Sequence, residues 1–514
     1  MRLFPNRAVK VFVLMASSTL AQAGEVLLTP APREAAWTQD RMELGRQCTI
    51  VAGAAEQQVA RVLCAELQRL HGVAAGIAPQ AASGPRITLC LDNTDAGKAW
   101  LGRLSGQVAW PPERNPQEAY VLSVDARDAV IVARSPRGLL YGSQTLLQLV
   151  RPAVSGPGSQ LLGVRIVDYP QLAFRGVHLC IFPNTELASI RQAILVAARY
   201  KYNAVVIEPW ASLASRKRPE TAYEHAYTPE QMRPLADLVR AAGMEMIPML
   251  NSWGHASGMR SRSSQHVVLD RFPRFRELYE PDGWSFCLSN PAIYPHLFDR
   301  YEELLEVFGP ARYFHLGMDE AWGHLGLTES KACRGSDPRK LLVDHLLKLH
   351  GYFAQRKIQV LMWHDMFIER NHPELGRLSP ANSVPPINSH LALADLPKDV
   401  IIAAWNYDES REWPVPKYFR DKGYPVVVCP WKSQRNTISL LNTAKRLDLL
   451  GLLATTWDSL DVALPSVAEA GVLAWTAPGY DLKRIPFDHW VREIRKLPIC
   501  DLPKLETTLK TPEN

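Results

Sequence analysis

Short apolar stretches alternate with helix-like segments between residues 176 and 456, and this alternation constrains the fold more than any other feature. Near-continuous apolar strands separated by helices are typical of a parallel sheet that is covered on its faces. The repeat occurs eight times, which is the pattern of a (β/α)8 TIM barrel. The predicted strands are 176–181, 204–207, 245–250, 313–316, 359–363, 400–404, 425–429 and 452–456. The clearest predicted helices are 187–200, 229–242, 291–308, 339–355 and 436–449.

A doubly wound sheet is the competing α/β topology. It would require a glycine-rich phosphate-binding turn after the first strand. The residues at that position are Ile181-Phe182-Pro183-Asn184-Thr185, which contain no glycine. The pattern therefore favours a barrel over residues 170–490, followed by a C-terminal tail over 491–514.

The region before the barrel has a different pattern. It contains a predicted helix at 59–70, a strand at 86–91, an antiparallel pair at 119–124 and 129–133, and a helix at 138–150. Residues 152–158 are rich in proline and glycine and are predicted to form a linker. We therefore predict a small α+β domain over residues 24–165.

The first 23 residues have the features of a secretory signal peptide. Arg2, Arg7 and Lys10 precede an apolar stretch, and Ala-Gln-Ala at 21–23 supplies small residues for cleavage. No cysteine lies directly after the cleavage site, where a lipid anchor would be attached, and no later stretch is long enough to span a membrane. We therefore expect an exported protein, periplasmic or secreted, with no membrane anchor.

Charge argues against a nucleic-acid-binding protein. The chain has 58 Lys and Arg against 52 Asp and Glu, a formal charge of +6. Removal of the three basic residues of the signal peptide leaves 58 − 3 − 52 = +3. Such a small excess, without a basic run that contains aromatic residues, predicts neither nucleic acid nor a membrane surface as partner.

The cysteines do not form a metal-binding pattern. The chain lacks Cys-x-x-Cys, and its histidines do not have the spacing of metal ligands, so we expect no metal and no cofactor. Cys180 and Cys429 lie in apolar strands and are predicted to be buried. The even count permits disulfides in an exported protein but leaves 105 pairings open. The eight positions are 48, 64, 90, 180, 287, 333, 429 and 500.

Two adjacent carboxyls, Asp319 and Glu320, follow the fourth predicted strand. Such a pair often caps the first turn of a helix. In a barrel, however, reactive groups lie where strands end. One carboxyl as proton donor and one as anion are what glycosidic bond cleavage requires. We therefore interpret the pair as a candidate catalytic site.

Aromatic residues follow several other predicted strands, beside polar groups. A pyranose ring stacks on flat aromatic side chains, and its hydroxyls need polar partners. A single tryptophan would more often be core packing, but several at equivalent positions favour a sugar pocket. The candidates for the pocket wall are Trp363, Trp405, Tyr407 and Trp457.

The segment from His315 to Glu320 resembles the His-x-Gly-x-Asp-Glu motif of glycoside hydrolase family 20, the β-N-acetylhexosaminidases. Residues 118–122 and 138–146 look like part of the small domain that precedes that family's barrel. Phe174-Arg175-Gly176 resembles its first-strand entry, and Trp253-Gly254-His255 its third-strand Gly-His element. The last of these, together with 319–326, is also similar to a divergent hexosaminidase D-like branch.

The resemblance implies an exo-acting, retaining β-N-acetylhexosaminidase that hydrolyses terminal β-linked GlcNAc or GalNAc from an oligosaccharide or glycoconjugate. The substrate's 2-acetamido oxygen would attack the anomeric carbon and form an oxazolinium intermediate, so the protein would supply no nucleophile. Glu320 would be the general acid and base, and Asp319 would hold the acetamide N–H and stabilise the developing positive charge.

The resemblance also implies roles for the binding residues. Arg175 would bind sugar hydroxyls rather than form a structural ion pair, and His255 belongs to the substrate site. Tyr407 is the candidate donor to the acetamide carbonyl, with Trp363, Trp405 and Trp457 as walls around its methyl group. His315 would orient the neighbouring acids or be a buried core histidine.

The sequence departs from the family pattern at several positions. Cys180, Glu208 and Trp253 occupy places where the family often has Asp, a His/Asp cluster and Pro. Two alternatives therefore remain: another TIM-barrel glycosidase, such as an α-glucuronidase-like enzyme, or a non-catalytic carbohydrate-binding relative. The sugar preference, linkage, disulfide pairing and oligomeric state remain open.

Overall fold

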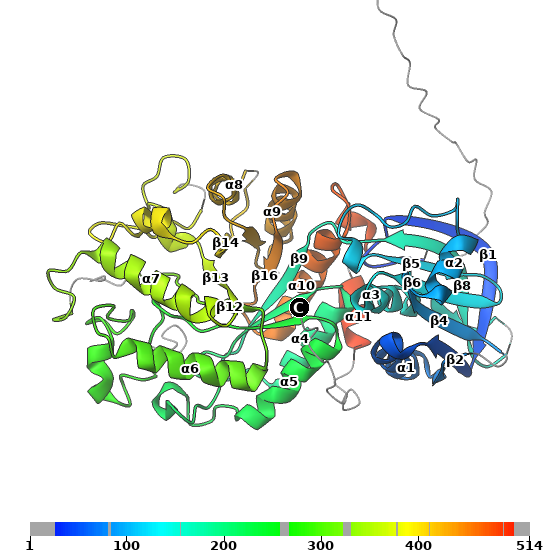
Figure 1. The fold of residues 1–514 in the computed structure, drawn as a ribbon, viewed down its shortest axis with the longest axis horizontal. Coiled ribbons are helices and arrows are strands. Elements are labelled where there is room, and N and C mark those ends of the chain that lie inside the picture. Colours follow the sequence, from blue (N-terminus) through cyan, green and yellow to red (C-terminus); the bar gives the residue numbers. More distant parts are fainter. Residues whose placement is uncertain are drawn as a thin grey trace, which may run out of the picture.

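The computed structural model describes residues 26–497, apart from 81–83, 155, 258–266, 322–329, 377–378, 411 and 487. The predicted signal peptide and most of the predicted C-terminal tail lie outside the described residues. Figure 1 shows a smaller N-terminal unit beside a larger unit built from strands and surrounding helices. Among the described helices, none has both the length and the apolar composition needed to cross a membrane.

The larger unit is a parallel barrel, as predicted. Its sheet order is β11-β10-β9-β16-β15-β14-β13-β12, and every pair of neighbours is parallel. Between β11 and β12 a single bridge, Met249 to His315, brings the ends of the sheet together. The strands are β9 (Phe174–Cys180), β10 (Ala204–Glu208), β11 (Glu245–Pro248), β12 (Tyr313–His315), β13 (Gln359–Trp363), β14 (Ile401–Trp405), β15 (Val426–Cys429) and β16 (Gly451–Ala454).

The five predicted barrel helices are confirmed, and α8 and α10 add to them. Thr228 and Gln231 form a capping box at the start of α5, so the local sequence itself begins this helix. The helices are α4 (Leu187–Arg199), α5 (Pro229–Ala241), α6 (Ile293–Phe308), α7 (Pro338–Ala354), α8 (Pro414–Asp421), α9 (Gln434–Arg446) and α10 (Leu460–Trp475).

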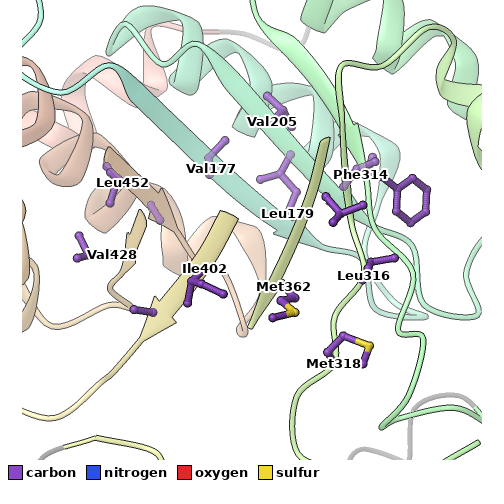
Figure 2. Packing of buried hydrophobic residues seen from close by; sticks show 14 of the residues in the cluster. Val177, Leu179, Val205, Phe314, Leu316, Met318, Met362, Ile402, Val428 and Leu452 are labelled. Atoms are coloured by element: carbon purple, nitrogen blue, oxygen red, sulfur yellow. The ribbon is translucent and has the colours of Figure 1, made fainter. Parts of the chain in front are cut away.

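Both faces of the barrel strands are buried, which explains their continuous apolar sequences. Val205 and Leu179 belong to the core between strands and helices, part of which Figure 2 shows. The alternate residues, such as Val206, belong to a separate core inside the barrel. Because successive side chains of a strand point to opposite faces, one strand contributes to both cores. Cys180 and Cys429 are fully buried in these strands, as predicted.

The N-terminal unit is a mixed sheet with helices, which confirms the predicted α+β architecture. Its strand order is β1-β8-β5-β6-β4-β2-β3, with β7 paired to β8. The strands are β1 (Glu34–Gly45), β2 (Gln47–Ala52), β3 (Ala74–Ala78), β4 (Arg86–Leu91), β5 (Tyr120–Val124), β6 (Asp128–Ala133), β7 (Val150–Pro152) and β8 (Ser159–Asp168). The helices are α1 (Gln57–His71), α2 (Asp95–Arg103) and α3 (Pro136–Leu147).

The predicted linker at 152–158 is instead the turn between β7 and β8. Ala153 N–H donates to the Gly158 carbonyl at 2.9 Å, and β8 continues the first sheet to Asp168. Proline and glycine mark a hairpin turn as readily as a linker, so composition alone did not separate the two. We predicted that the barrel ends at residue 490, but a further helix, α11 (His489–Arg495), includes residues on both sides of that boundary.

Arg175 does not lie in the sugar pocket, so that prediction is wrong. It is the second residue of β9, and its side chain is fully buried. Because a strand rises about 3.3 Å per residue, Arg175 lies about 16 Å from Cys180, the last residue of the strand. Its guanidinium donates to Glu118 at 2.8 Å and to the Tyr141 hydroxyl at 3.0 Å. Both partners belong to the N-terminal unit, so Arg175 joins the two units at the opposite end of the barrel.

Candidate active site

The chain turns sharply after β12 and presents both predicted acids. Gly317, Met318 and Glu320 have φ angles of 71°, 77° and 48°. Residues other than glycine rarely adopt this left-handed conformation, and surrounding contacts must maintain it. Glu320 N–H donates to Asp365 Oδ2 at 2.9 Å, and Trp284 Nε1 donates to the Glu320 carbonyl at 2.6 Å.

His255 lies between the two acids. Its Nε2 is 3.4 Å from Asp319 Oδ2 and 3.5 Å from Glu320 Oε2. Burial by itself would lower the pKa of His255, but the two carboxylates raise it to about 10. The imidazole is therefore a cation at neutral pH that holds both acids.

Gly254 allows the histidine loop to approach the acids closely. A Cβ at Gly254 would lie 2.1 Å from the Asp319 carbonyl oxygen, which is far inside van der Waals contact. The close approach explains in physical terms why a glycine precedes His255.

Asp365 follows β13 and supports Glu320 from the other side. It is fully buried and also accepts hydrogen bonds from Asn382 Nδ2 at 2.9 Å and Trp405 Nε1 at 3.1 Å. Burial and the charge of Asp319 raise the pKa of Asp365 to about 7, although the donors that it accepts from oppose this. Asp365 thereby connects the general-acid candidate to the aromatic wall.

One carboxylate oxygen of Asp319 has no hydrogen-bond partner among the described residues. Asp319 is 8% exposed, and its Oδ1 accepts no hydrogen bond from the part of the chain that the structure describes. A buried carboxylate oxygen without a donor is costly. It is therefore a place where a ligand N–H or O–H would be stabilised.

Three of the predicted aromatic residues form one wall. Trp405 and Tyr407 stack with centroids 5.1 Å apart, and Trp457 Nε1 donates to the Tyr407 hydroxyl at 2.5 Å. Burial raises the pKa of Tyr407 well above its usual value, and the charge of Asp319 adds to this. The phenol therefore keeps its proton and can donate it.

Trp363 lies deeper than predicted. Its side chain is fully buried in the core inside the barrel, with ring centroids 5.9 Å from Trp457 and 4.4 Å from His315. It therefore supports the wall from below. Trp253, another strand-end tryptophan, is buried in the core between strands and helices.

His315 does not contact the two acids. It is fully buried, and its Nδ1 accepts a hydrogen bond from Gly317 N–H at 3.1 Å. Burial, together with His178, lowers its pKa well below the usual value, so it is neutral. Of its two predicted roles, the structure supports the buried core histidine, which holds the turn before Asp319.

A polar chain inside the barrel was not predicted. His178 Nε2 lies 2.9 Å from Glu208 Oε2, and Asn251 Nδ2 donates to Glu208 Oε1 at 2.6 Å. Asn251 also lies against the turn, because a Cβ at Gly317 would be 2.0 Å from its Oδ1. Glu208 is the last residue of β10, and Asn251 and Asp365 follow β11 and β13. A position at a strand end is the signal that could have identified all three. No such signal marks Trp284.

Within the described parts of the chain, two groups of side chains have the spacing of metal ligands. His255, Asp319 and Glu320 offer atoms within 4.8 Å of one another, as do Glu280, Cys287 and Cys333. In the first group the distances fit hydrogen bonds from a protonated imidazole to two carboxylates. The second group contains neither Asp319 nor Glu320.

Replacing His255 with Gln is expected to change how stability depends on pH. Because the folded-state pKa of about 10 exceeds the ordinary 6.5, the bound proton stabilises the fold fully below pH 6.5. This stabilisation, on the order of a few kcal/mol, is lost as pH rises toward 10. Urea unfolding at pH 6 and pH 9.5 should show that His255→Gln destabilises the protein much more at pH 6.

His350, which pairs with Asp399 at 2.9 Å on the surface, provides the matched control. His350→Gln should leave the pH dependence close to that of the wild type. Equal loss of stability at both pH values for His255→Gln would contradict the assignment of a protonated His255.

Two family models match the chain. One, described as glycosyl hydrolase family 20, domain 2, covers residues 25–169. The other, described as glycosyl hydrolase family 20, catalytic domain, covers residues 164–434, which is more than half of the chain. The second match includes the acid pair, His255 and the Trp405–Tyr407 part of the wall.

Curated relatives are similar over parts of the chain. The beta-hexosaminidase of Porphyromonas gingivalis is 28% identical over 275 residues, which are 48% of this chain and 34% of that protein. The beta-hexosaminidase of Vibrio furnissii is 25% identical over 333 residues, 54% of this chain and 52% of that protein. The chain thus spans about half or less of the length of these relatives.

Solved structures share the fold over most of the chain. An exo-β-N-acetylglucosaminidase from Vibrio harveyi, in complex with N-acetylglucosamine, has a TM-score of 0.65 at 17% identity and covers 91% of this chain and 77% of that chain. A mutant Streptomyces plicatus beta-hexosaminidase in complex with product GlcNAc has a TM-score of 0.64 at 17% identity, with 89% and 92% covered. The two-unit architecture is therefore shared.

Proposed function

Because the chain belongs to glycosyl hydrolase family 20, we propose that it is an exo-acting, retaining β-N-acetylhexosaminidase that removes terminal β-linked GlcNAc or GalNAc. The observation that carries this proposal is Asp319 Oδ1, a buried acceptor beside the acid Glu320 to which none of the described residues donates a hydrogen bond. An N-acetylhexosamine brings an amide N–H to this position. A hexose without the acetamide group brings no such N–H.

Asp319 directs a nucleophile that belongs to the substrate. By accepting the acetamide N–H, its carboxylate would position the amide oxygen for attack on the anomeric carbon. As the C1–O bond to the leaving group breaks, positive charge develops on the oxazolinium ring. A carboxylate already in place stabilises that charge without reorganisation.

Glu320 moves the proton. It would protonate the leaving oxygen as the glycosidic bond breaks, and then take a proton from the water that opens the oxazolinium ring. Two displacements at the anomeric carbon leave its β configuration unchanged. His255 contacts Glu320 Oε2 and Asp319 Oδ2 and would hold both carboxylates in position through these steps.

The aromatic wall would enclose the acetamide group. The Tyr407 hydroxyl would donate to the acetamide oxygen and increase the positive character of the oxazolinium carbon. Trp405 and Trp457 would pack on the methyl group, with Trp363 below them. The GlcNAc in the Vibrio harveyi and Streptomyces plicatus complexes supports this substrate class.

Two further predictions remain part of the proposal. The signal peptide over 1–23 would place the enzyme in the periplasm or outside the cell, where an oligosaccharide or glycoconjugate with a terminal N-acetylhexosamine is its substrate. The similarity to the hexosaminidase D-like branch remains a prediction.

The test is hydrolysis of matched aryl glycosides by the purified chain. We expect release of the aryl group from the β-N-acetylglucosaminide or the β-N-acetylgalactosaminide, and at least 10³-fold slower release from the β-glucoside, which lacks the internal nucleophile. Proton NMR of the first product should show the β anomer. Equal hydrolysis of the glucoside would overturn the proposal, as would binding of GlcNAc without turnover of either substrate.

A further inference from the structure

We propose that Cys287 and Cys333 form a disulfide that closes a covalent loop around the catalytic acid pair. Their Sγ atoms lie 3.4 Å apart, and the two residues are 46 positions apart in the chain. Both side chains are fully buried, so they can only react with one another or with a group beside them. Asp319 and Glu320 lie between them in the sequence.

The backbone on both sides of the pair is already held in place. Cys287 N–H donates to the Leu278 carbonyl at 2.9 Å, beside the bridge between Tyr279 and Phe286. Cys333 N–H donates to Ser330 Oγ at 3.0 Å. The S–S distance in a disulfide is 2.03–2.05 Å, so the sulfur atoms need to approach by about 1.4 Å. Small side-chain rotations supply movements of this size.

Cys287 has the chemistry of the attacking thiol. Hydrogen bonding with Cys333 and Ser330, at 3.4 and 3.0 Å, lowers the pKa of Cys287 to about 7, although burial opposes this. A substantial fraction is therefore thiolate at neutral pH, which is the reactive form. Cys429, in barrel strand β15, lacks this feature, because burial raises its pKa well above the usual value.

The bond would form by thiol–disulfide exchange late in folding, when Cys287 and Cys333 are already neighbours but a small disulfide can still reach them. The Cys287 thiolate attacks one sulfur of a low-molecular-weight disulfide such as oxidised glutathione and releases one glutathione thiolate. Cys333 loses its proton and displaces the second glutathione from the mixed disulfide. Two thiols become one disulfide, and one oxidised glutathione becomes two reduced molecules.

The pair is placed to affect the active site. Trp284, three residues before Cys287, donates to the Glu320 carbonyl at 2.6 Å. A link to Cys333 would fix this loop relative to the described turn at 330–336. The disulfide would thereby maintain the left-handed backbone of Glu320, whose φ is 48°. This consequence rests on the proposed function, but formation of the bond does not.

Metal binding is the competing interpretation of the same residues. Glu280 offers a third ligand atom within 4.8 Å of both sulfurs. Structural zinc sites almost always have four protein ligands, usually Cys and His. The described residues here provide two cysteines and one carboxylate, so we favour the disulfide.

The test is peptide mapping of the full chain, refolded in a buffer of oxidised and reduced glutathione. The protein is alkylated in denaturant without reductant, digested and analysed by mass spectrometry. We expect a linked pair of peptides, two hydrogens lighter than the separate thiols, that contains Cys287 and Cys333. Cys90 and Cys429, whose thiols donate to backbone carbonyls, should be alkylated and serve as internal controls. Alkylated Cys287 and Cys333 would overturn the proposal, as would one equivalent of zinc that protects both thiols.

A double variant measures the consequence. C287S/C333S is expected to lower Tm by about 3 °C or more relative to the oxidised wild type and to lower kcat/KM. C90S, which alters a buried cysteine of the N-terminal unit, is the matched control and should change kcat/KM little. A wild-type Tm that does not change on full reduction would overturn the proposal. If the linked peptide forms but no glycoside is hydrolysed, the proposed function fails and the disulfide stands.

Discussion

Glu320→Gln is expected to reduce kcat/KM on a β-N-acetylglucosaminide with a poor leaving group by about 10² to 10⁴-fold, the range typical of a general acid. Glutamine has the same shape but cannot transfer a proton to the leaving oxygen. The backbone contacts that hold this position, to Asp365 and Trp284, do not involve the side chain and should persist. Initial rates with a series of aryl leaving groups measure the loss.

The dependence on the leaving group separates acid catalysis from a general loss of structure. A dinitrophenyl group leaves without protonation, so the first step with this substrate should be much less affected by Glu320→Gln. Glu306→Gln, on an exposed helix position that pairs with Arg216, is the matched control and should keep full activity. Wild-type rates for Glu320→Gln on the poor leaving group would contradict the assignment.

Asp319→Asn is expected to lower kcat by about 10² to 10³-fold, with a smaller change in KM. Asparagine keeps the shape of the side chain but removes the charge that stabilises the oxazolinium ion. The fixed charge matters most in the transition state, so the rate should fall more than binding of the ground state. Steady-state kinetics on the aryl N-acetylglucosaminide and the affinity for a thiazoline analogue of the intermediate measure both effects.

Asp344→Asn, on the surface of α7 in an ion pair with Lys340, is the control for loss of one carboxylate. Its kinetics should match the wild type. The two active-site variants should also differ in one respect. The good leaving group restores activity to Glu320→Gln but not to Asp319→Asn, because charge stabilisation is needed for every leaving group. Restoration in both variants would show that the two acids do not have separate roles.

Most of the barrel could be predicted because burial of its strands is a local property of the sequence. A strand such as β15, buried on both faces, is apolar at each successive residue, whatever its neighbours are. The position of Asp319 and Glu320 after β12 followed in the same way, since strand ends of a barrel gather on one face. Helix α5 was predicted over 229–242, and the capping box that begins it, formed by Thr228 and Gln231, is likewise a local feature of the sequence.

The errors concern residues whose role depends on which end of a strand they occupy and what packs there. Arg175 was assigned to the sugar, but it lies near the start of β9, where Glu118 of the other unit meets it. The same Pro- and Gly-rich composition that predicted a linker forms the turn between β7 and β8. No local pattern distinguishes these alternatives.

The sequence by itself determined the barrel, the preceding α+β unit and the acid pair at a strand end, because periodic burial and chain breaks act over a few neighbouring residues. Only the tertiary structure decided what surrounds the pair. Three residues that contact Glu320 come from distant parts of the chain: His255 is 65 positions away, Asp365 is 45 and Trp284 is 36. Such contacts depend on how distant loops pack around the closed barrel, and the same packing determines the charge on His255 and the open acceptor on Asp319.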